Sequence, residues 1–443
     1  MSEVHIVGAG LAGTEIAYQL ATRGVRVRIH EMRPKVMTPV HKTGYYAELV
    51  CSNSLKSLEL RNASGLLKRE MEILGSVIIK TAKETRVPSG KALAVDRDRF
   101  SSTLTDVITS LGVKVDNEEV EKIPDDSEIW VIATGPATSP KFSAYLEKIF
   151  SNWLYFFDAV APIISAESID FSKAFFANRY DPQGKDYLNC PLNEKEYDDF
   201  YTALIQAETV PMEDFDRGLL FERCMPVEEI ARTGRMSLLY GPMKPVGLND
   251  PQTNRRPYAV VQLRKEDEMG SLYNLVGFQT RLKWSEQKRL LRTVPALKNA
   301  EIVRYGVMHR NLYVDSRNVL DKYFRLKEDK RIFFAGQITG VEGYLESAAS
   351  GLYVAMNICR VLKGLSPIEL PRGTLMGALF RYVTSGRRKL RPMYASYGLL
   401  SPDGKSSLKR SNIAKESIKS LANFSEQIGW KVGGTVEDTT QRF

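Results

Sequence analysis

The first thirteen residues place the strongest constraint on how this chain folds. A strand-like run, Val4–Val7, leads directly into a G-x-G-x-x-G motif at Gly8, Gly10 and Gly13. In a β-α-β unit the first glycine turns the chain out of the strand, the second lets a pyrophosphate approach the backbone, and the third lets the helix pack against the strand. A helix over Thr14–Thr22 and a second strand over Val25–His30 complete the unit. The simpler interpretation, a glycine turn between buried elements, does not account for all of these features together.

The motif predicts a dinucleotide at the start of the first helix. Unsatisfied N–H groups and the helix dipole favour the negative charge of a pyrophosphate there. Glu31, at the end of the second strand, is expected to accept hydrogen bonds from the ribose hydroxyls. The predicted contacts in this unit are Gly8, Ala9, Gly10, Leu11, Ala12, Gly13, Glu31 and Arg33.

Two later segments indicate that the dinucleotide is FAD rather than NAD. Glu128–Thr134 is a buried-type strand that ends at Gly135, and Arg331–Gly336 is another, followed by a glycine-rich loop and a long apolar helix, Leu345–Leu362. The small residues at 347–351 are expected to let a ligand approach that helix closely. A late strand–loop–helix that completes an early nucleotide-binding unit is typical of FAD folds. The predicted contacts in these segments are Ala133, Thr134, Gly135, Gly336, Glu342, Gly343 and Ser347.

The pattern between these segments predicts an inserted domain. Residues 155–300 alternate strand-like runs (Ser237–Tyr240, Tyr258–Leu263 and Leu272–Gly277) with helices such as Glu194–Ala207. We therefore predict an α/β fold: an FAD-binding Rossmann-type (glutathione-reductase-like) domain that holds an α+β insertion. The expected divisions are 1–155 for the first part of the FAD domain, 156–300 for the insertion, and 301–443 for the completion of the FAD domain and a basic tail.

Composition and the number of cysteines indicate the class of protein and its compartment. The chain of 443 residues is 43% apolar and 26% charged, which is ordinary for a globular protein. We expect no secretory signal and no membrane span, because no apolar run approaches the roughly 20 residues that a span requires. The four cysteines are scattered without a C-x-x-C pair, so we expect neither a disulfide framework nor a metal site, and a reducing, cytoplasmic compartment.

The formal charge of +9 is unevenly distributed. Basic residues gather at 381–391 and again at 405–419. Such patches attract polyphosphates, although a solvated surface explains many basic runs. The charge alone leaves both interpretations open.

Two cysteines are candidates for chemistry. Cys51 lies in a polar loop just after the first nucleotide unit, and Cys224 follows Arg223 and precedes a Pro–Glu–Glu helix start. A nearby cation or helix N-terminus lowers the pKa of a thiol and activates it. A small buried apolar residue is the ordinary role of a lone cysteine, and spacing alone does not decide against it. Cys359 is expected to be core, and His41 and His309 are candidates to orient a substrate.

At this point the residues resemble a known family, the folate- and FAD-dependent tRNA uracil-5-methyltransferases (TrmFO), which are relatives of larger flavoproteins that modify the wobble uridine. The resemblance covers essentially the whole chain, and several of its motifs are long and idiosyncratic. The segments that carry it are Gly8–Gly13, Glu31–Pro34, Glu48–Leu55, Ala94–Arg97, Tyr187–Pro191, Cys224–Glu228, Gly241–Leu248, Val276–Trp284, Arg304–Asn311, Gly340–Ser347 and Pro392–Ala395.

The resemblance implies an enzyme that forms 5-methyluridine in the tRNA T-loop. Methylenetetrahydrofolate would give the one-carbon unit, and reduced FAD, recharged by NADH or NADPH, would supply the electrons. By similarity Cys224 is the thiol nucleophile and Cys51 its partner, although the two roles are open to exchange. We expect lysines and arginines of the insertion and tail to bind tRNA phosphates, and we expect no obligate protein partner.

Three other functions stay open from the sequence. One is the same chemistry on a ribosomal RNA uridine. Another is a flavin oxidoreductase that acts without RNA. The third is a nucleotide-sensing RNA-binding protein without catalysis, for which both cysteines would be dispensable.

Overall fold

The computed structural model describes residues 3–38, 40–149, 153–181, 183–211, 225–386, 390–400 and 409–430. The larger body is built on a five-stranded parallel sheet. Its order is β16-β7-β1-β2-β6, and the residues of β7 and β16 are all buried, as in parallel sheets that are covered on both faces. The strands are β1 (Glu3–Val7), β2 (Arg26–His30), β6 (Lys114–Asp116), β7 (Ile129–Ile132) and β16 (Ile332–Phe334).

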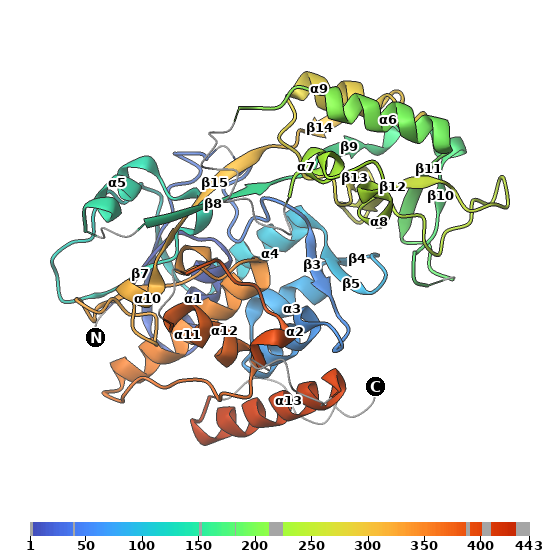
Figure 1. Cartoon of the computed structure of the whole chain (residues 1–443). Helices are drawn as coiled ribbons and strands as arrows, with labels where there is room; N and C mark the ends of the chain where they lie inside the picture. The colour runs from blue at the N-terminus through green and yellow to red at the C-terminus, as the bar shows by residue number, and fades with distance from the viewer. Residues whose placement is uncertain are drawn as a thin grey trace.

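Two helices from opposite ends of the sequence pack against each other beside this sheet. They are α1 (Leu11–Ala21) and α11 (Tyr344–Leu362) (Figure 1). A Cβ added at Gly351 would lie 2.5 Å from the carbonyl oxygen of Ala12, so only glycine permits this crossing. Ala348, Ala349 and Ser350 are fully buried. The expectation that the small residues of α11 admit a ligand is therefore wrong for Gly351, which admits the neighbouring helix, and for Ala348, Ala349 and Ser350, which have no exposed surface.

The rest of the larger body surrounds the sheet with helices and one small antiparallel sheet. The buried Glu70 of α2 accepts the N–H groups of Leu375 and Met376 at 2.7 and 2.8 Å and the hydroxyl of Ser417, so it joins α2, α12 and α13. The elements are β3 (Ser54–Ser57), α2 (Ala63–Ile73), α3 (Val77–Glu84), β4 (Arg86–Val87), β5 (Ala92–Val95), α4 (Arg97–Ser110), α5 (Pro140–Ile149), α10 (Ser316–Val319), α12 (Leu375–Thr384) and α13 (Arg410–Gln427).

A second body is built around a six-stranded antiparallel sheet of order β10-β11-β12-β13-β9-β14. Its buried apolar residues, from Ala161 to Ala300, form a core of their own. Its strands are β9 (Ile163–Ser165), β10 (Phe175–Phe176), β11 (Tyr187–Leu192), β12 (Ala259–Lys265), β13 (Leu272–Leu275) and β14 (Ile302–Arg304). Its helices are α6 (Glu194–Gln206), α7 (Val227–Arg232), α8 (Ser237–Tyr240) and α9 (Trp284–Leu291).

An antiparallel pair of strands connects the two bodies. The chain leaves the larger body along β8 (Trp153–Ala159) and returns along β15 (Met308–Val314), and the two strands pair over seven residues (Figure 1). This path agrees with an insertion inside the nucleotide-binding fold. The domain limits at residues 155 and 300 stay predictions.

Most of the expected elements are confirmed within a residue or two. The helix expected over Thr14–Thr22 begins three residues earlier, at Leu11. The strand expected over Ser237–Tyr240 is wrong, since these residues form the short helix α8. Two leucines in a four-residue run fit a strand and a helix turn equally well, and periodicity does not separate them. Within the described ranges, no helix is both long enough and apolar enough to cross a membrane.

Candidate active site

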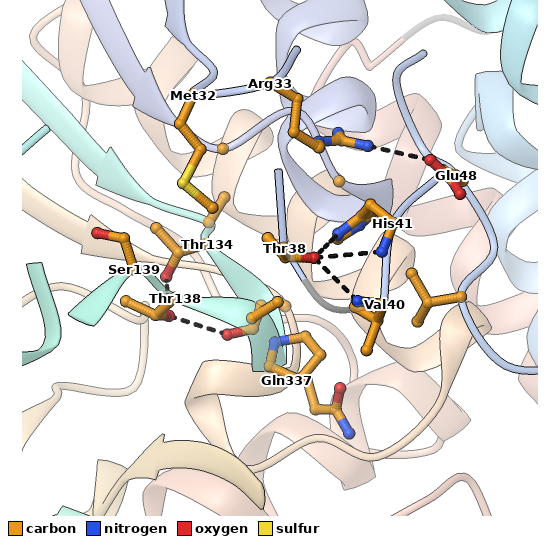
Figure 2. Close-up of a pocket in the computed structure, with 18 of the residues that line it drawn as sticks. Met32, Arg33, Thr38, Val40, His41, Glu48, Thr134, Thr138, Ser139 and Gln337 are labelled. Atoms are coloured by element: carbon orange, nitrogen blue, oxygen red, sulfur yellow. Dashed lines mark hydrogen bonds and ion pairs between the residues drawn. The ribbon is translucent and has the colours of Figure 1, made fainter. Parts of the chain in front are cut away.

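A cavity of about 770 Å³ lies at the carboxyl ends of β1, β2, β7 and β16. This is the edge at which open α/β sheets bind ligands. Figure 2 shows part of its wall, with Met32, Arg33, Thr134 and Gln337 turned toward one space. Of the predicted site residues, those that line the cavity are Gly8, Gly10, Leu11, Ala12, Glu31, Arg33, Cys51, Ala133, Thr134, Gly135, Gly336, Glu342, Gly343 and Ser347.

The three glycines of the motif differ in their surroundings. Gly8 has φ +100°, and a Cβ there would lie 2.8 Å from the carbonyl oxygen of Ala133. A Cβ at Gly13 would lie 1.9 Å from the carbonyl oxygen of Gly8. A Cβ at Gly10 would meet nothing within 4 Å, although Gly10 lines the cavity. Gly8 and Gly13 are thus required by the protein's own packing, whereas the open space at Gly10 fits a bound group.

Glu31 and Arg33 form a buried charge pair in the cavity wall. The Glu31 carboxylate accepts the N–H of Ala9 at 2.8 Å and the Arg33 Nε at 2.8 Å, and Arg33 reaches Glu48 at 3.4 Å (Figure 2). Burial raises the pKa of Glu31, but the hydrogen bond and charge of Arg33 outweigh burial and lower it. Glu31 is therefore ionised and keeps lone pairs for ribose hydroxyls. Of the predicted cofactor-binding residues, Ala9 and Gly13 do not line the cavity: Ala9 binds the Glu31 carboxylate and Gly13 packs against Gly8.

The late glycine-rich loop forms the opposite wall. Gly336 and Gly343 have φ +85° and +117°, a conformation that favours glycine. The N–H of Gly336 donates to Ser350 Oγ at 2.7 Å, and Glu342 accepts Gln337 Nε2 at 2.7 Å. These bonds fix the loop before α11 begins. The start of α11 therefore faces the same cavity as the start of α1.

Cys51 stands on the cavity wall in a loop that other elements hold in place. The Tyr344 hydroxyl accepts the Cys51 N–H at 2.6 Å. Arg97, at the start of α4 and with 11% of its side chain exposed, donates to the carbonyls of Leu49 and Cys51 and forms an ion pair with Glu266 at 2.7 Å. Burial disfavours the charge of Arg97, but the charge of Glu266 outweighs burial and raises its pKa.

Two further arginines reach the same loop from the second body. Arg304 of β14 donates to the carbonyls of Val40 and Val50 at 2.7 and 2.9 Å. Arg264 of β12 donates to Asn53 Oδ1 at 2.9 Å and to Ser52 Oγ at 2.7 Å. Sequence reasoning missed Arg97, Arg264 and Arg304 as parts of the site. Only the Ala94–Arg97 and Arg304–Asn311 motifs hinted at two of them.

The remaining cysteines have different settings. Cys224 lies outside the described residues, so its distance from Cys51 stays untested. Burial raises the pKa of the Cys190 thiol to about 12, and burial also raises the pKa of Cys359 on α11. Both thiols are therefore neutral at pH 7 and unsuited to nucleophilic attack, which agrees with the expectation that Cys359 is core.

His41 lines the cavity as a neutral ring. Its Nδ1 lies 2.6 Å from the Thr38 hydroxyl (Figure 2). Burial and the charge of Arg33 lower the pKa of His41 to about 4. The side chain of His309 lies outside the described residues.

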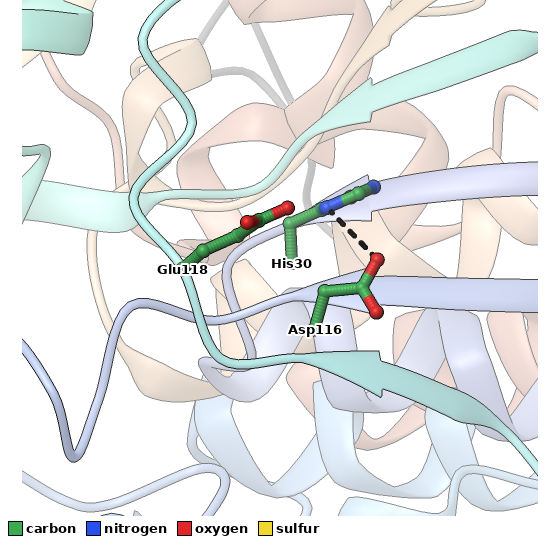
Figure 3. Close-up of side chains that lie close together, drawn as sticks. All are labelled: His30, Asp116 and Glu118. Carbon is green, nitrogen blue, oxygen red and sulfur yellow. Dashed lines mark ion pairs between the residues drawn. The ribbon is translucent and has the colours of Figure 1, made fainter.

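One group of side chains near the cavity has the spacing of metal ligands. Ligand atoms of His30, Asp116 and Glu118 lie within 4.8 Å of one another (Figure 3). Arg28 already donates to both Asp116 oxygens at 2.9 and 3.1 Å, and His30 pairs with His5 at 3.0 Å. We assign no metal to this group, because Arg28 and His5 already hold two of its three members and Glu118 is exposed.

The basic tail contributes an exposed helix. Lys409, Arg410, Lys415 and Lys419 are exposed on or beside α13, whose apolar face packs against the larger body (Figure 1). Arg387, Arg388, Lys389 and Lys405 lie outside the described residues.

Comparison with known proteins supports this description of the fold. Two crystal structures of GidA from Aquifex aeolicus, forms II and I, match 98% of this chain with TM-scores of 0.72 and 0.68; they are 16% identical to it, and 74% and 76% of those chains are covered. The family model "Glucose inhibited division protein A" matches residues 3–366.

A parallel sheet with a G-x-G-x-x-G turn, closed by a late glycine-rich loop and helix, defines an FAD-binding flavoprotein of the Rossmann type. A methylenetetrahydrofolate–tRNA-(uracil-5-)-methyltransferase TrmFO from Pseudothermotoga lettingae is 58% identical over the full length of both chains. The TrmFO of Thermotoga maritima strain MSB8 is also 58% identical, over 96% of this chain and 100% of its own. The chain belongs to the GidA family and, within it, to the TrmFO methyltransferases.

Proposed function

We propose that this protein methylates C5 of a uridine in the T-loop of tRNA, with methylenetetrahydrofolate as the one-carbon donor and FAD as the cofactor. The full-length identity to proteins named for that activity supports the reaction. The observation in this chain that supports it most directly is a cysteine, Cys51, on the wall of the dinucleotide cavity. The T-loop position and the source of electrons, NADH or NADPH, are parts of the proposal.

The cavity residues fit FAD. The space at Gly10, the N-termini of α1 and α11, and the ionised Glu31 offer backbone donors to a pyrophosphate and a carboxylate to a ribose. Fourteen predicted residues line the cavity, and we assign the cofactor contacts to all of them except Cys51. Ala9 and Gly13 would hold these residues in place. Bound and reduced, FAD supplies the hydride that turns a methylene group into a methyl group.

The cysteines supply covalent catalysis. C5 of uracil is a weak nucleophile, and addition of a thiolate to C6 makes C5 nucleophilic enough to attack the one-carbon unit. A second group then accepts the C5 proton as the bond from the methylene to the folate nitrogen breaks and tetrahydrofolate leaves. Hydride addition to the exocyclic methylene gives the methyl group, and loss of the thiolate from C6 restores the ring. We assign the attack to Cys224 and the assisting role to Cys51, with exchange of the two as the alternative assignment.

The position of Cys224 in the sequence is compatible with this role. Val227, three residues later, donates its N–H to the carbonyl of Gln279 at 2.7 Å. Thr280, which follows Gln279 in the chain, forms a β-bridge with Val160, and Val160 lines the cavity. Three extended residues span at most about 11 Å. These contacts place Val227 close to a residue of the cavity wall, which supports assigning the attacking thiol to Cys224.

The RNA must present its base outside a helical stack. A uracil that is paired or stacked is inaccessible to a thiol in a cavity, so an exposed or flipped base is required. Basic residues of α13 and of the insertion would bind phosphates, in a cytoplasmic setting where tRNA is processed. We expect the affinity for tRNA to fall steeply as salt concentration rises.

Mass mapping of RNA tests the proposal. Purified holoprotein is incubated with methylenetetrahydrofolate, NADPH or NADH, and either a tRNA or a ribosomal RNA transcript. We expect one added methyl group on a T-loop uridine, which is lost when folate is omitted and in Cys51→Ala and Cys224→Ala. Methylation of the ribosomal transcript alone, flavin turnover indifferent to RNA and folate, or full methylation by both alanine variants would each contradict it.

A further inference from the structure

One exposed aromatic pair in the second body has no role in the cavity just described. Trp284, the first residue of α9, is 61% exposed. Its ring stacks on that of Tyr305, with centroids 5.0 Å apart and an angle of 17° between the planes. The other tryptophans whose side chains are described, Trp130 and Trp430, are 4% and 6% exposed. Trp284 thus differs from the other tryptophans whose side chains are described.

The exposure of Trp284 makes packing an insufficient explanation for it. A tryptophan contributes to a core by removing its large apolar surface from water, and most of the Trp284 surface stays in water. Contact with Tyr305 fixes the orientation of the indole while its remaining surface is open. A fixed, open aromatic ring is the arrangement that proteins use to stack unpaired bases.

The residues on either side of Tyr305 contact the cavity wall. Tyr305 stands between Arg304, which holds the carbonyls of Val40 and Val50, and Gly306. A Cβ added at Gly306 would lie 2.7 Å from the carbonyl oxygen of Val160. Val40, Val50 and Val160 all line the cavity, whereas Trp284 and Tyr305 do not. The chain on both sides of Tyr305 is thus joined to the cavity wall, although neither ring of the pair lines the cavity.

The helix that begins with Trp284 carries exposed basic residues. The exposed cations on and beside α9 are Lys283, Lys288, Arg289, Arg292 and Lys298. Lys283 pairs with Glu208 and Arg289 with Glu286, both at 2.5 Å. Within the described part of the chain, Lys288, Arg292 and Lys298 have no acidic side chain within 4.0 Å, so they are available for phosphates.

We propose that Trp284 and Tyr305 form a stacking platform for an unpaired base of the substrate RNA, and that Lys288 and Arg292 contact the adjacent phosphates. This inference rests on the proposed function, since it assigns part of the RNA contact to the second body. A platform on the segment that joins the second body to the cavity wall would hold a neighbouring base while the target uridine enters the cavity. The planar pteridine of the folate is the other group of suitable shape, and the test separates the two.

The experiment measures tRNA binding by holoenzyme, without folate or reductant, at one fixed salt concentration. Loss of one base–aromatic stack is worth about 1–3 kcal/mol, and we expect Trp284→Ala to raise the Kd for tRNA about tenfold. Trp284→Phe keeps a ring and should stay within about threefold of wild type. Tyr240→Ala, which removes another exposed ring of the insertion (81% exposed), is the matched control and should leave the Kd unchanged. Equal FAD content in all variants confirms folding.

A Trp284→Ala variant whose Kd for tRNA stays within twofold of wild type would overturn the platform. A raised KM for methylenetetrahydrofolate with an unchanged Kd for tRNA would also overturn it and assign the rings to the pteridine. Because binding is measured without turnover, its result is separate from the methylation assay. If the wild-type protein methylates tRNA and Trp284→Ala binds tRNA with the wild-type Kd, only the platform is contradicted and the proposed function stands.

Discussion

The Tyr344 hydroxyl accepts the main-chain N–H of Cys51 at 2.6 Å, across 293 positions of sequence. Tyr344 is the first residue of α11, the helix whose N-terminus faces the cavity beside that of α1. The loop that carries Cys51 is therefore positioned by the same element that completes the nucleotide site. Binding of the cofactor and placement of the thiol share one structural support.

Replacement of Tyr344 by Phe tests this support. The variant leaves the Cys51 N–H without its acceptor, and one lost hydrogen bond costs about 1 kcal/mol. We expect the FAD content to be retained and kcat for methylation to fall severalfold as the loop loosens. Tyr353→Phe is the matched control, because its hydroxyl donates to the Lys322 carbonyl at 3.0 Å from the same helix. Equal loss of kcat in both variants would show that the effect is only one of stability.

The glycine motif makes a second prediction, because substitutions at its different glycines should have different effects. Gly10→Val should fold with ordinary stability but purify without flavin absorbance, because its side chain enters the space expected to hold a pyrophosphate. Gly13→Ala should instead lower the free energy of unfolding by about 1–3 kcal/mol, because its Cβ meets the Gly8 carbonyl. Gly373→Val, at a position with no atom within 4 Å, is the control. Stoichiometric flavin in Gly10→Val would contradict the cofactor assignment.

The buried ion pair between Arg97 and Glu266 makes a third prediction. Glu266→Gln leaves the Arg97 charge buried without its partner, and such a change costs about 3–5 kcal/mol. We expect a loss of stability on urea unfolding and faster alkylation of Cys51, followed by mass spectrometry of its peptide, since Arg97 also holds the Leu49 and Cys51 carbonyls. The control is Arg99→Lys. Arg99 lies on the same helix as Arg97 and forms an exposed pair with Glu268, so this change should alter stability by less than about 0.5 kcal/mol. An unchanged rate of alkylation in Glu266→Gln would argue that the pair does not hold the loop.

The sequence predicted those parts of the fold that depend on local pattern. The turn at Gly8, the buried strand at Ile129–Ile132 and the long helix after Gly343 carry their signal in neighbouring residues, so they were found in place. The four-residue helix at Ser237–Tyr240 was missed because a run that short has no resolvable period.

The loop around Cys51 could not be derived in the same way. Its supports come from Arg97, Arg264, Arg304 and Tyr344, which lie far apart in sequence and meet only once two bodies pack together. An arginine that binds carbonyls has the same local pattern as one that is solvated. The small residues of α11 were misread for a related reason, because a helix and a ligand place the same demand on side-chain size.

His41 supplies a prediction about pH. An unfolded histidine has a pKa of about 6.5, whereas burial and Arg33 lower the pKa of His41 to about 4 in the folded protein. Between these values the unfolded chain binds a proton that the folded chain excludes. The stability that His41 contributes is thus fully present above pH 6.5 and is lost as pH falls toward 4, with a slope of at most about 1.4 kcal/mol per pH unit.

We expect the Tm of His41→Gln to decline less than that of wild type across this window. Thr38→Val, which removes the hydrogen bond to the ring but keeps the titrating group, should lower the Tm and keep the wild-type slope. Parallel curves for His41→Gln and wild type would show that His41 does not titrate in this range.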